Sequence, residues 1–174
     1  MNRGGNFMVQ GKAHKFDDNI NTDYIIAGKY TKTLDYNFLA EHVFEDISPG
    51  FYKKMEPGDY VVAGLNFGCG SSREQAVLAL KYAKVGAILA KSFARIFFRN
   101  AINLGLPALI CNTDKIQDQD LLEIDLSSQK IYNLTTNQQI HMESLPEIMI
   151  SILSEGGLTP YLKKNKTFTL PVAE

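Results

Sequence analysis

Short apolar runs alternate with helix-like repeats as far as Cys111. Residues 60–65, 86–90 and 107–111 are apolar runs with the length of buried strands. After each of the first two runs, apolar residues recur every three or four positions, which is typical of a helix with one buried face. The second of these helices is predicted to run from Ser92 to Leu104 and to be closed by Gly105. Because strands joined through helices run parallel, the sequence predicts a parallel sheet with crossover connections. Residues 9–16 alternate weakly and predict a further strand.

The pattern changes beyond Asp114. Residues 121–126 and 130–134 alternate apolar and polar side chains, as antiparallel strands with one buried face do, and 140–142 predict a third short strand. A last amphipathic helix is predicted to begin at Ser144 and to end at Gly156. The predicted fold is therefore α/β, with mixed parallel and antiparallel strands.

The composition is that of an ordinary globular domain: 174 residues, 45% hydrophobic, formal net charge −1. We expect no nucleic-acid partner, because no basic stretch stands out. We expect no membrane partner and a cytoplasmic protein, because the apolar runs are too short to span a bilayer and no signal peptide is recognisable. Residues 1–7 are predicted to be a disordered lead-in, 8–164 the folded domain and 165–174 a tail.

The chemistry concentrates in residues 66–74, Asn-Phe-Gly-Cys-Gly-Ser-Ser-Arg-Glu, between the first apolar run and its helix. The two glycines permit a sharp turn and close approach of a ligand to the backbone. Ser71-x-x-Glu74 matches a capping box, which predicts that the free amides at the helix start face this turn. Those amides and the helix dipole favour an anion, and Arg73 adds a planar fork for a carboxylate or phosphate.

Other interpretations of this segment are possible. A capping box is more often only a helix start. Three known loops are excluded: a Walker loop needs a lysine, a dinucleotide fingerprint needs a small residue where Arg73 stands, and a nucleophile elbow needs Gly-x-Ser-x-Gly. Two further features stay open between solvated surface and ligand contact, namely the polar loop 17–23 with its carboxylate at Asp23, and the stripe Arg95, Arg99, Asn103.

Four ordered motifs resemble the aconitase superfamily. They are Asn21-Thr-Asp23, Phe67-Gly-Cys-Gly-Ser-Ser-Arg-Glu74, Ala90-Lys-Ser-Phe-Ala-Arg-Ile96 and Arg99-Asn-Ala-Ile-Asn-x-Gly-Leu-Pro107. More narrowly, the chain is similar to the free-standing small subunits of the 3-isopropylmalate dehydratase and homoaconitase family, over roughly residues 8–164. The resemblance implies the swivelling β/β/α domain of that superfamily.

The resemblance also implies a reaction, the removal and re-addition of water on a hydroxy-dicarboxylic acid. A [4Fe-4S] cluster binds the leaving hydroxyl, and a serine alkoxide takes the proton next to a carboxylate. By the family pattern Ser71 is that catalytic base, Ser72 and Arg73 hold a substrate carboxylate, and Asp23 and Lys32 face the substrate. A serine is a poor base in water, so a neighbouring cation and helix amides must stabilise its anion.

The same resemblance implies a partner. Three cysteine thiolates hold such a cluster in the aconitase pattern, with one iron left open to substrate. This chain has only Cys69 and Cys111, so we expect a large subunit to carry the cluster and no metal ligand in this chain.

The substrate depends on residues 30–33, Tyr-Thr-Lys-Thr, which correspond to the family loop that contacts the substrate's variable arm. The leading interpretation is interconversion of 2-isopropylmalate and 3-isopropylmalate in leucine biosynthesis. Lys32 could instead pair with an additional carboxylate, which favours homoaconitate or another hydroxy acid. The alternative of a different class is a non-catalytic, anion-binding domain that has kept the fold.

Overall fold

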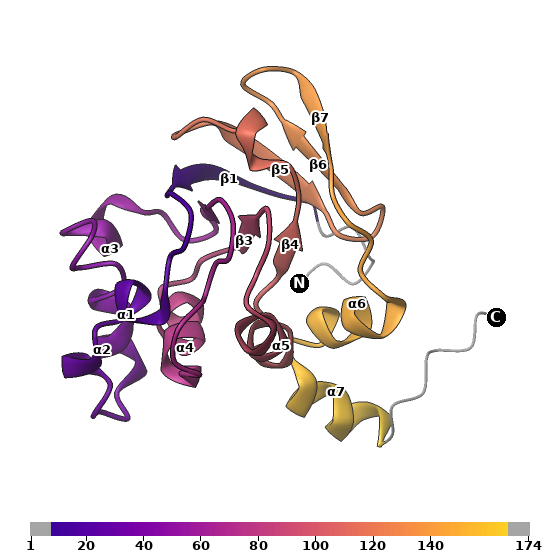
Figure 1. Cartoon of the computed structure of the whole chain (residues 1–174). Helices are drawn as coiled ribbons and strands as arrows, with labels where there is room; N and C mark the ends of the chain where they lie inside the picture. The colour runs from indigo at the N-terminus through magenta and orange to yellow at the C-terminus, as the bar shows by residue number, and fades with distance from the viewer. Residues whose placement is uncertain (1–7, 167–174) are drawn as a thin grey trace.

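The computed structural model describes residues 8–166. One sheet of seven strands has the order β4-β3-β2-β1-β5-β6-β7 (Figure 1). Its strands are β1 (Met8–Lys15), β2 (Tyr60–Val62), β3 (Ala87–Ala90), β4 (Ala108–Ile110), β5 (Leu121–Asp125), β6 (Lys130–Asn133) and β7 (Gln138–His141). The helices are α1 (Thr22–Ile25), α2 (Tyr36–Glu41), α3 (Phe51–Lys54), α4 (Glu74–Tyr82), α5 (Arg95–Leu104), α6 (Glu147–Ser154) and α7 (Leu158–Asn165). Short 3-10 turns, η1 (Gly28–Tyr30) and η2 (Thr113–Lys115), complete the elements.

The sheet has a parallel half and an antiparallel half, which meet at β1. Strands β1 to β4 pair in parallel, whereas β1, β5, β6 and β7 pair antiparallel. The sheet curls until Cys111, just after β4, bridges Met142, just after β7. The amide of Glu143 closes this seam by donating to the carbonyl of Ile110 at 2.8 Å. The mixed α/β fold predicted from the sequence is confirmed.

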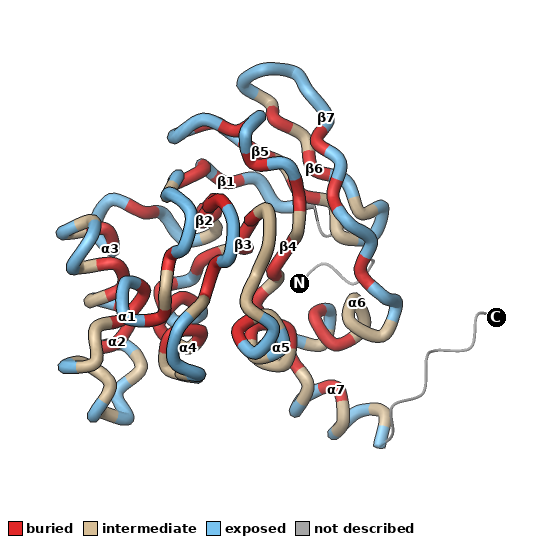
Figure 2. The backbone as a smooth tube through the Cα atoms, in the orientation of Figure 1, coloured by how far each residue is buried: buried red, intermediate tan, exposed pale blue. Residues whose placement is uncertain are grey.

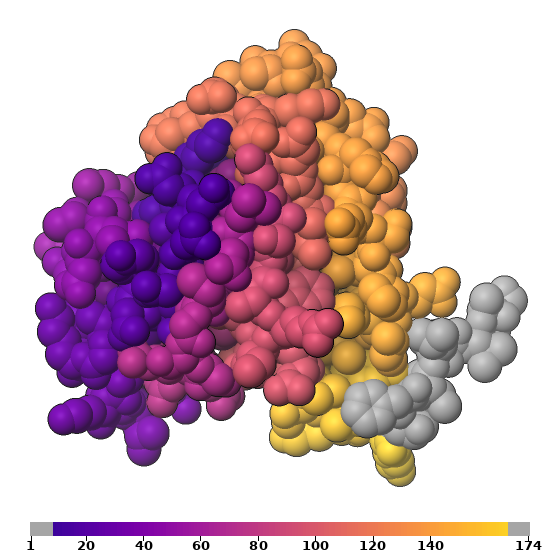
Figure 3. All heavy atoms as spheres, viewed as in Figure 1, coloured from indigo at the N-terminus to yellow at the C-terminus, as the bar shows by residue number. Residues whose placement is uncertain are grey.

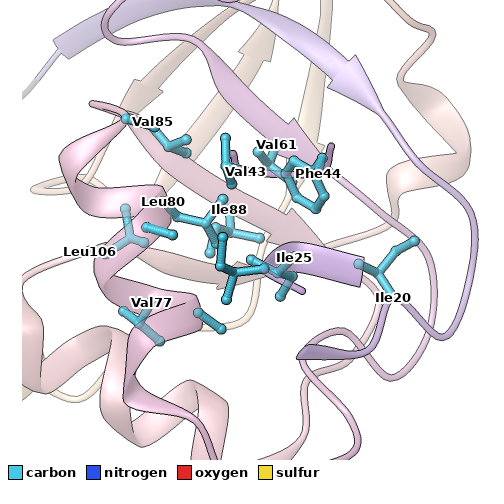
Figure 4. Close-up of a cluster of buried hydrophobic side chains, with 14 of the residues drawn as sticks. Ile20, Ile25, Val43, Phe44, Val61, Val77, Leu80, Val85, Ile88 and Leu106 are labelled. Atoms are coloured by element: carbon cyan, nitrogen blue, oxygen red, sulfur yellow. The ribbon is translucent and has the colours of Figure 1, made fainter. Parts of the chain in front are cut away.

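Strands β2 and β3 consist of buried residues only (Figure 2), because each of their faces is covered by its own core. On one face, Val61 and Ile88 pack with residues of α1 to α4 such as Ile25 and Leu80 (Figure 4). The other face forms the inside of the curl, where β-strand side chains pack with α6 and α7. Helix α5 contributes side chains to both cores. Figure 3 shows the N-terminal part of the chain, in indigo and purple, packed against the later part, in pink and orange.

The structure adds a helix that the sequence pattern did not predict. After Gly156 and Gly157 the chain forms α7, whose Tyr161 is buried in the inner core. Pro160 lies near its start, where a proline is tolerated because the first amides of a helix have no intrahelical partner. The predicted lead-in, 1–7, and residues 167–174 of the predicted tail, 165–174, lie outside the described residues, whereas Asn165 is the last residue of α7. Within 8–166, no helix has the length and apolar character needed to cross a membrane.

Candidate functional site

Three loops meet where the parallel strands β1, β2 and β3 end. The amide of Gly68 donates to the carbonyl of Ile20 at 2.7 Å, and the amide of Thr22 donates to Cys69 at 2.9 Å. On the other side, the amide of Phe67 donates to Ser92 at 3.0 Å. The loop after β2 is therefore held between the other two, at the carboxyl end of a parallel sheet, which is where open α/β folds bind ligands.

The loop after β2 needs glycine at defined points. Gly68 and Gly70 have φ values of 76° and 87°, in the left-handed region that side chains disfavour. A Cβ on Gly68 would also lie 2.1 Å from Cγ of Phe97 in α5. The glycines predicted to allow a close approach thus let the loop pack directly on an aromatic ring of the next helix.

These loops surround a pocket of about 340 Å³ that opens beside the starts of α4 and α5. Its lining residues are Thr22, Gly68, Gly70, Ser71, Ser72, Arg73, Ala94, Arg95, Ile96, Phe97 and Asn100. The side chains of Ser71 and Ser72 are exposed, and neither makes a hydrogen bond to another residue of 8–166. Both hydroxyls are therefore available to a ligand in the pocket.

The capping-box prediction for Ser71 is wrong. Helix α4 begins at Glu74, its N-cap is Arg73, and no side chain caps it. Ser71 is instead held through its backbone, because the hydroxyl of Thr22 donates to its carbonyl at 3.0 Å. The predicted start of α5 at Ser92 is also too early, since Ser92 and Ala94 are bonded to Phe67 and the helix begins at Arg95. Its predicted end at Gly105, with φ 78°, is confirmed.

Arg73 forms an ion pair with Asp23, which joins α1 to the loop after β2. The Arg73 side chain is 27% exposed and the Asp23 side chain 55% exposed. The guanidinium lies against Gly28, where an added Cβ would be 3.5 Å from Nη1. Asp23 itself does not line the pocket, so its carboxylate contacts the arginine from outside the pocket lining.

Lys32 lies apart from these groups. It is exposed, follows η1 and does not line the pocket. The structure therefore brings together Ser71, Ser72 and Arg73 in one pocket, pairs Asp23 with Arg73, and leaves Lys32 outside the pocket lining.

Three polar lining residues were not singled out as site residues from the sequence: Thr22, Arg95 and Asn100. All three stand within the motifs that carry the family resemblance, which was the available signal. Of the predicted stripe Arg95, Arg99 and Asn103, Arg95 lines the pocket, whereas Arg99 and Asn103 do not.

The residues of 8–166 do not fit an iron–sulfur cluster. They contain no group of three His, Cys, Asp or Glu side chains that could hold a metal ion. Cys69 lies in the loop after β2, with its thiol 3.7 Å from the carbonyl of Asn19. Cys111 is buried after β4, and burial raises the pKa of its thiol to about 12, which disfavours the thiolate that ligates iron.

Comparison with known proteins finds relatives along most of this chain. Residues 51–113 match the aconitase C-terminal domain. The chain is 55% identical over 157 residues to 3-isopropylmalate dehydratase small subunit 2 of Archaeoglobus fulgidus, covering 89% of this chain and 94% of that protein. It is 52% identical over 159 residues to the methanogen homoaconitase small subunit of Methanocaldococcus jannaschii, covering 91% and 94%.

A crystal structure described as 3-isopropylmalate dehydratase from Methanocaldococcus jannaschii has the same fold. It superposes with a TM-score of 0.88 at 51% identity, covering 92% of this chain and 96% of that one. The resemblance read from the four motifs is thereby confirmed. The chain belongs to the family of small subunits of 3-isopropylmalate dehydratase and homoaconitase, within the aconitase superfamily.

Proposed function

We propose that this chain is the small subunit of a cytoplasmic, two-subunit hydro-lyase that interconverts 2-isopropylmalate and 3-isopropylmalate. Residues 8–164 act as one swivelling domain that brings the pocket to a large subunit. The observation that carries the proposal is the presentation of Ser71, Ser72 and Arg73 together in one pocket. The named relatives of both kinds, at about equal identity, support a hydroxy acid that carries two or more carboxylates.

Ser71 is the catalytic base, holding at Oγ the proton that moves to and from the carbon next to a carboxylate. A free serine hydroxyl is too weakly acidic to lose its proton unaided, so its alkoxide requires nearby positive charge. The guanidinium of Arg73 and the uncapped amides at the start of α4 supply it. The Ser71 side chain is exposed in this chain alone, and the large subunit excludes water from it by covering the pocket.

Arg73 and Ser72 bind one substrate carboxylate. Asp23 engages Nη1 of Arg73, and this leaves Nη2 and Nε without a partner among residues 8–166. Those two donors match the two oxygens of a carboxylate. Asp23 is accordingly a positioning residue, and its own negative charge is kept outside the pocket lining.

The substrate's variable arm separates the two candidate acids. Ala94, Ile96 and Phe97 give the pocket an apolar wall, which suits an isopropyl group. Lys32 favours the second candidate, homoaconitate, because an additional carboxylate could pair with its ammonium. Since Lys32 does not line the pocket, the isopropyl acid is the better supported substrate.

The large subunit supplies the [4Fe-4S] cluster, because the cysteines of this chain do not fit one. The test is reconstitution of this chain with a large subunit that carries the cluster, under anaerobic conditions. Conversion is followed by the ultraviolet absorbance of the unsaturated diacid formed on loss of water. We expect turnover of isopropylmalate only when both subunits are present, and none with Ser71→Ala.

The same experiment separates the alternatives. Turnover of homoaconitate in preference to isopropylmalate would assign the second substrate. A chain that binds dicarboxylates but neither associates with the large subunit nor supports turnover would be an anion-binding domain, and the enzymatic proposal would be wrong.

A further inference from the structure

Arg95 places a second cation in the pocket. It is the first residue of α5 and lines the pocket with Ser71, Ser72 and Arg73. Its side chain is exposed and makes no ion pair or hydrogen bond within residues 8–166. The side chain is therefore free to contact a ligand without breaking an existing interaction.

The two pocket arginines differ in how their charges are balanced. Arg73 and Arg95 are the charged residues among those that line the pocket. The charge of Arg73 is offset by Asp23, whereas no acidic group is paired with Arg95 among the described residues. A dianion entering the pocket thus meets one arginine that is already paired with a carboxylate, Arg73, and one that is not, Arg95.

The position of Arg95 is not explained by the stability of α5. A cation at the first residue of a helix opposes the positive end of the helix dipole. No acidic residue stands in the first turn of α5, and the N-cap, Ala94, supplies no side-chain hydrogen bond. Arg99, one turn later on the same helix, is exposed and outside the pocket, so it offers a matched comparison.

We infer that Arg95 binds the second carboxylate of the hydroxy-diacid, while Arg73 and Ser72 bind the first. The inference rests on the proposed function and adds to it the residue that requires the substrate to be a diacid. Asn100, one turn beyond Ile96 on the same wall of the pocket, has an amide that can donate to the same carboxylate.

The test measures binding by calorimetry in the complex with the large subunit, so it does not depend on turnover. The probes are 2-isopropylsuccinate, which has the substrate's skeleton without its hydroxyl, and its two monoamides. The proteins are wild type, Arg95→Gln and the matched control Arg99→Gln. Affinity for the large subunit is measured for each protein, to separate substrate contact from subunit contact.

We expect the wild type to prefer the diacid to either monoamide. In Arg95→Gln the affinity for the diacid should fall about ten- to a hundredfold, the effect of losing a charge-assisted pair. The preference for the diacid over one monoamide should disappear, and the preference over the other should persist because Arg73 still binds that carboxylate. Arg99→Gln should behave as the wild type.

Unchanged preferences for both monoamides in Arg95→Gln would overturn the inference, including when affinity for the large subunit falls. A wild-type complex that does not bind the diacid would overturn it as well. A complex that binds the diacid with the expected preferences but turns over neither isopropylmalate nor homoaconitate would contradict the proposed function and leave the assignment of Arg95 supported.

Discussion

The guanidinium of Arg73 is paired with the carboxylate of Asp23, 50 positions earlier in the chain. The pair joins α1 to the loop after β2 and restrains the guanidinium at Nη1. A ligand therefore meets an arginine that is already partly ordered, so that less conformational entropy is lost on binding.

Replacing Arg73 by lysine should be nearly as damaging as replacing it by alanine. An ammonium cannot pair with Asp23 and also present two donors in a plane to a carboxylate. We expect kcat/KM of the reconstituted enzyme to fall by about ten- to a hundredfold or more, from loss of a charge-assisted bidentate contact. Full activity in Arg73→Lys would show that Arg73 provides only a diffuse positive charge.

Asp23→Asn provides a milder companion change. It keeps the arginine and its charge but weakens the contact that orients it. We expect a rise in KM smaller than that of Arg73→Lys, because an exposed ion pair contributes only about 0–1 kcal/mol. Steady-state kinetics of both variants with the same large subunit gives the comparison.

Ser71→Ala should abolish turnover and leave the fold intact. The Ser71 side chain is exposed and makes no hydrogen bond within residues 8–166, so its loss should change the free energy of unfolding by less than about 0.5 kcal/mol. Loss of a catalytic base should lower kcat by about 10²–10⁴-fold. Urea unfolding and turnover are measured on the same preparation, and near-normal turnover would remove Ser71 from the chemistry.

Gly68→Ala should destabilise the loop for two separable reasons. Its φ of 76° disfavours a side chain, and the new Cβ would meet Cγ of Phe97 at 2.1 Å. Gly50 has a similar φ of 73° with nothing within 4 Å, so Gly50→Ala reports the backbone cost alone, about 1–2 kcal/mol. Urea unfolding should show a larger loss for Gly68→Ala, and equal losses would mean that Phe97 moves aside at no cost.

The buried pair of His14 and Asp59 should make the stability depend on pH. Nε2 of His14 lies 2.8 Å from Oδ2 of Asp59. Burial opposes ionisation of Asp59, but hydrogen bonds from His14 and from the amides of Glu56 and Lys12 outweigh it and hold the pKa of Asp59 below its usual value. Because the folded pKa is lowered, ionised Asp59 adds stability above the unfolded pKa of about 3.9.

That contribution should be lost as the pH falls through the folded pKa of Asp59. We expect the melting temperature of the wild type to fall below about pH 5, and that of Asp59→Asn to be lower at neutral pH and less dependent on acid. Asp125→Asn is the comparison: hydrogen bonds from Ser127 and Ser128 lower the pKa of Asp125 to about 2, but solvent screens this hairpin turn and the effect should be smaller. If the melting temperatures of wild type and Asp59→Asn fall equally as the pH is lowered, ionised Asp59 is not the source of the acid sensitivity.

Lys32→Leu tests the choice between an alkyl and a carboxylate arm. If Lys32 pairs with an additional carboxylate, its loss should sharply lower kcat/KM for homoaconitate. Activity on isopropylmalate should be unchanged or higher, because burying an unpaired ammonium against an alkyl group is unfavourable. Equal ratios of the two kcat/KM values in wild type and variant would place the choice of substrate in the large subunit.

The sequence by itself determined the elements whose side chains repeat with a clear period. The apolar runs before Asn66 and Lys91 and the alternating strands after Asp120 were located to within a few residues, because burial on one or both faces requires those patterns. Four ordered motifs, one of which contains Ser71, were sufficient to identify the family. Each of these features is local or depends on residue type alone.

The tertiary structure decided how the loops are held and which side chains share the pocket. Ser71 matches a capping box, yet its loop is tied by hydrogen bonds to Thr22 and Ser92, and the helix begins only at Glu74. The same packing brings Arg95 beside Ser71 and leaves Arg99 outside, although both arginines occupy one helical stripe. These outcomes depend on contacts between segments far apart in the chain, and the local pattern of residues carries no information about such contacts.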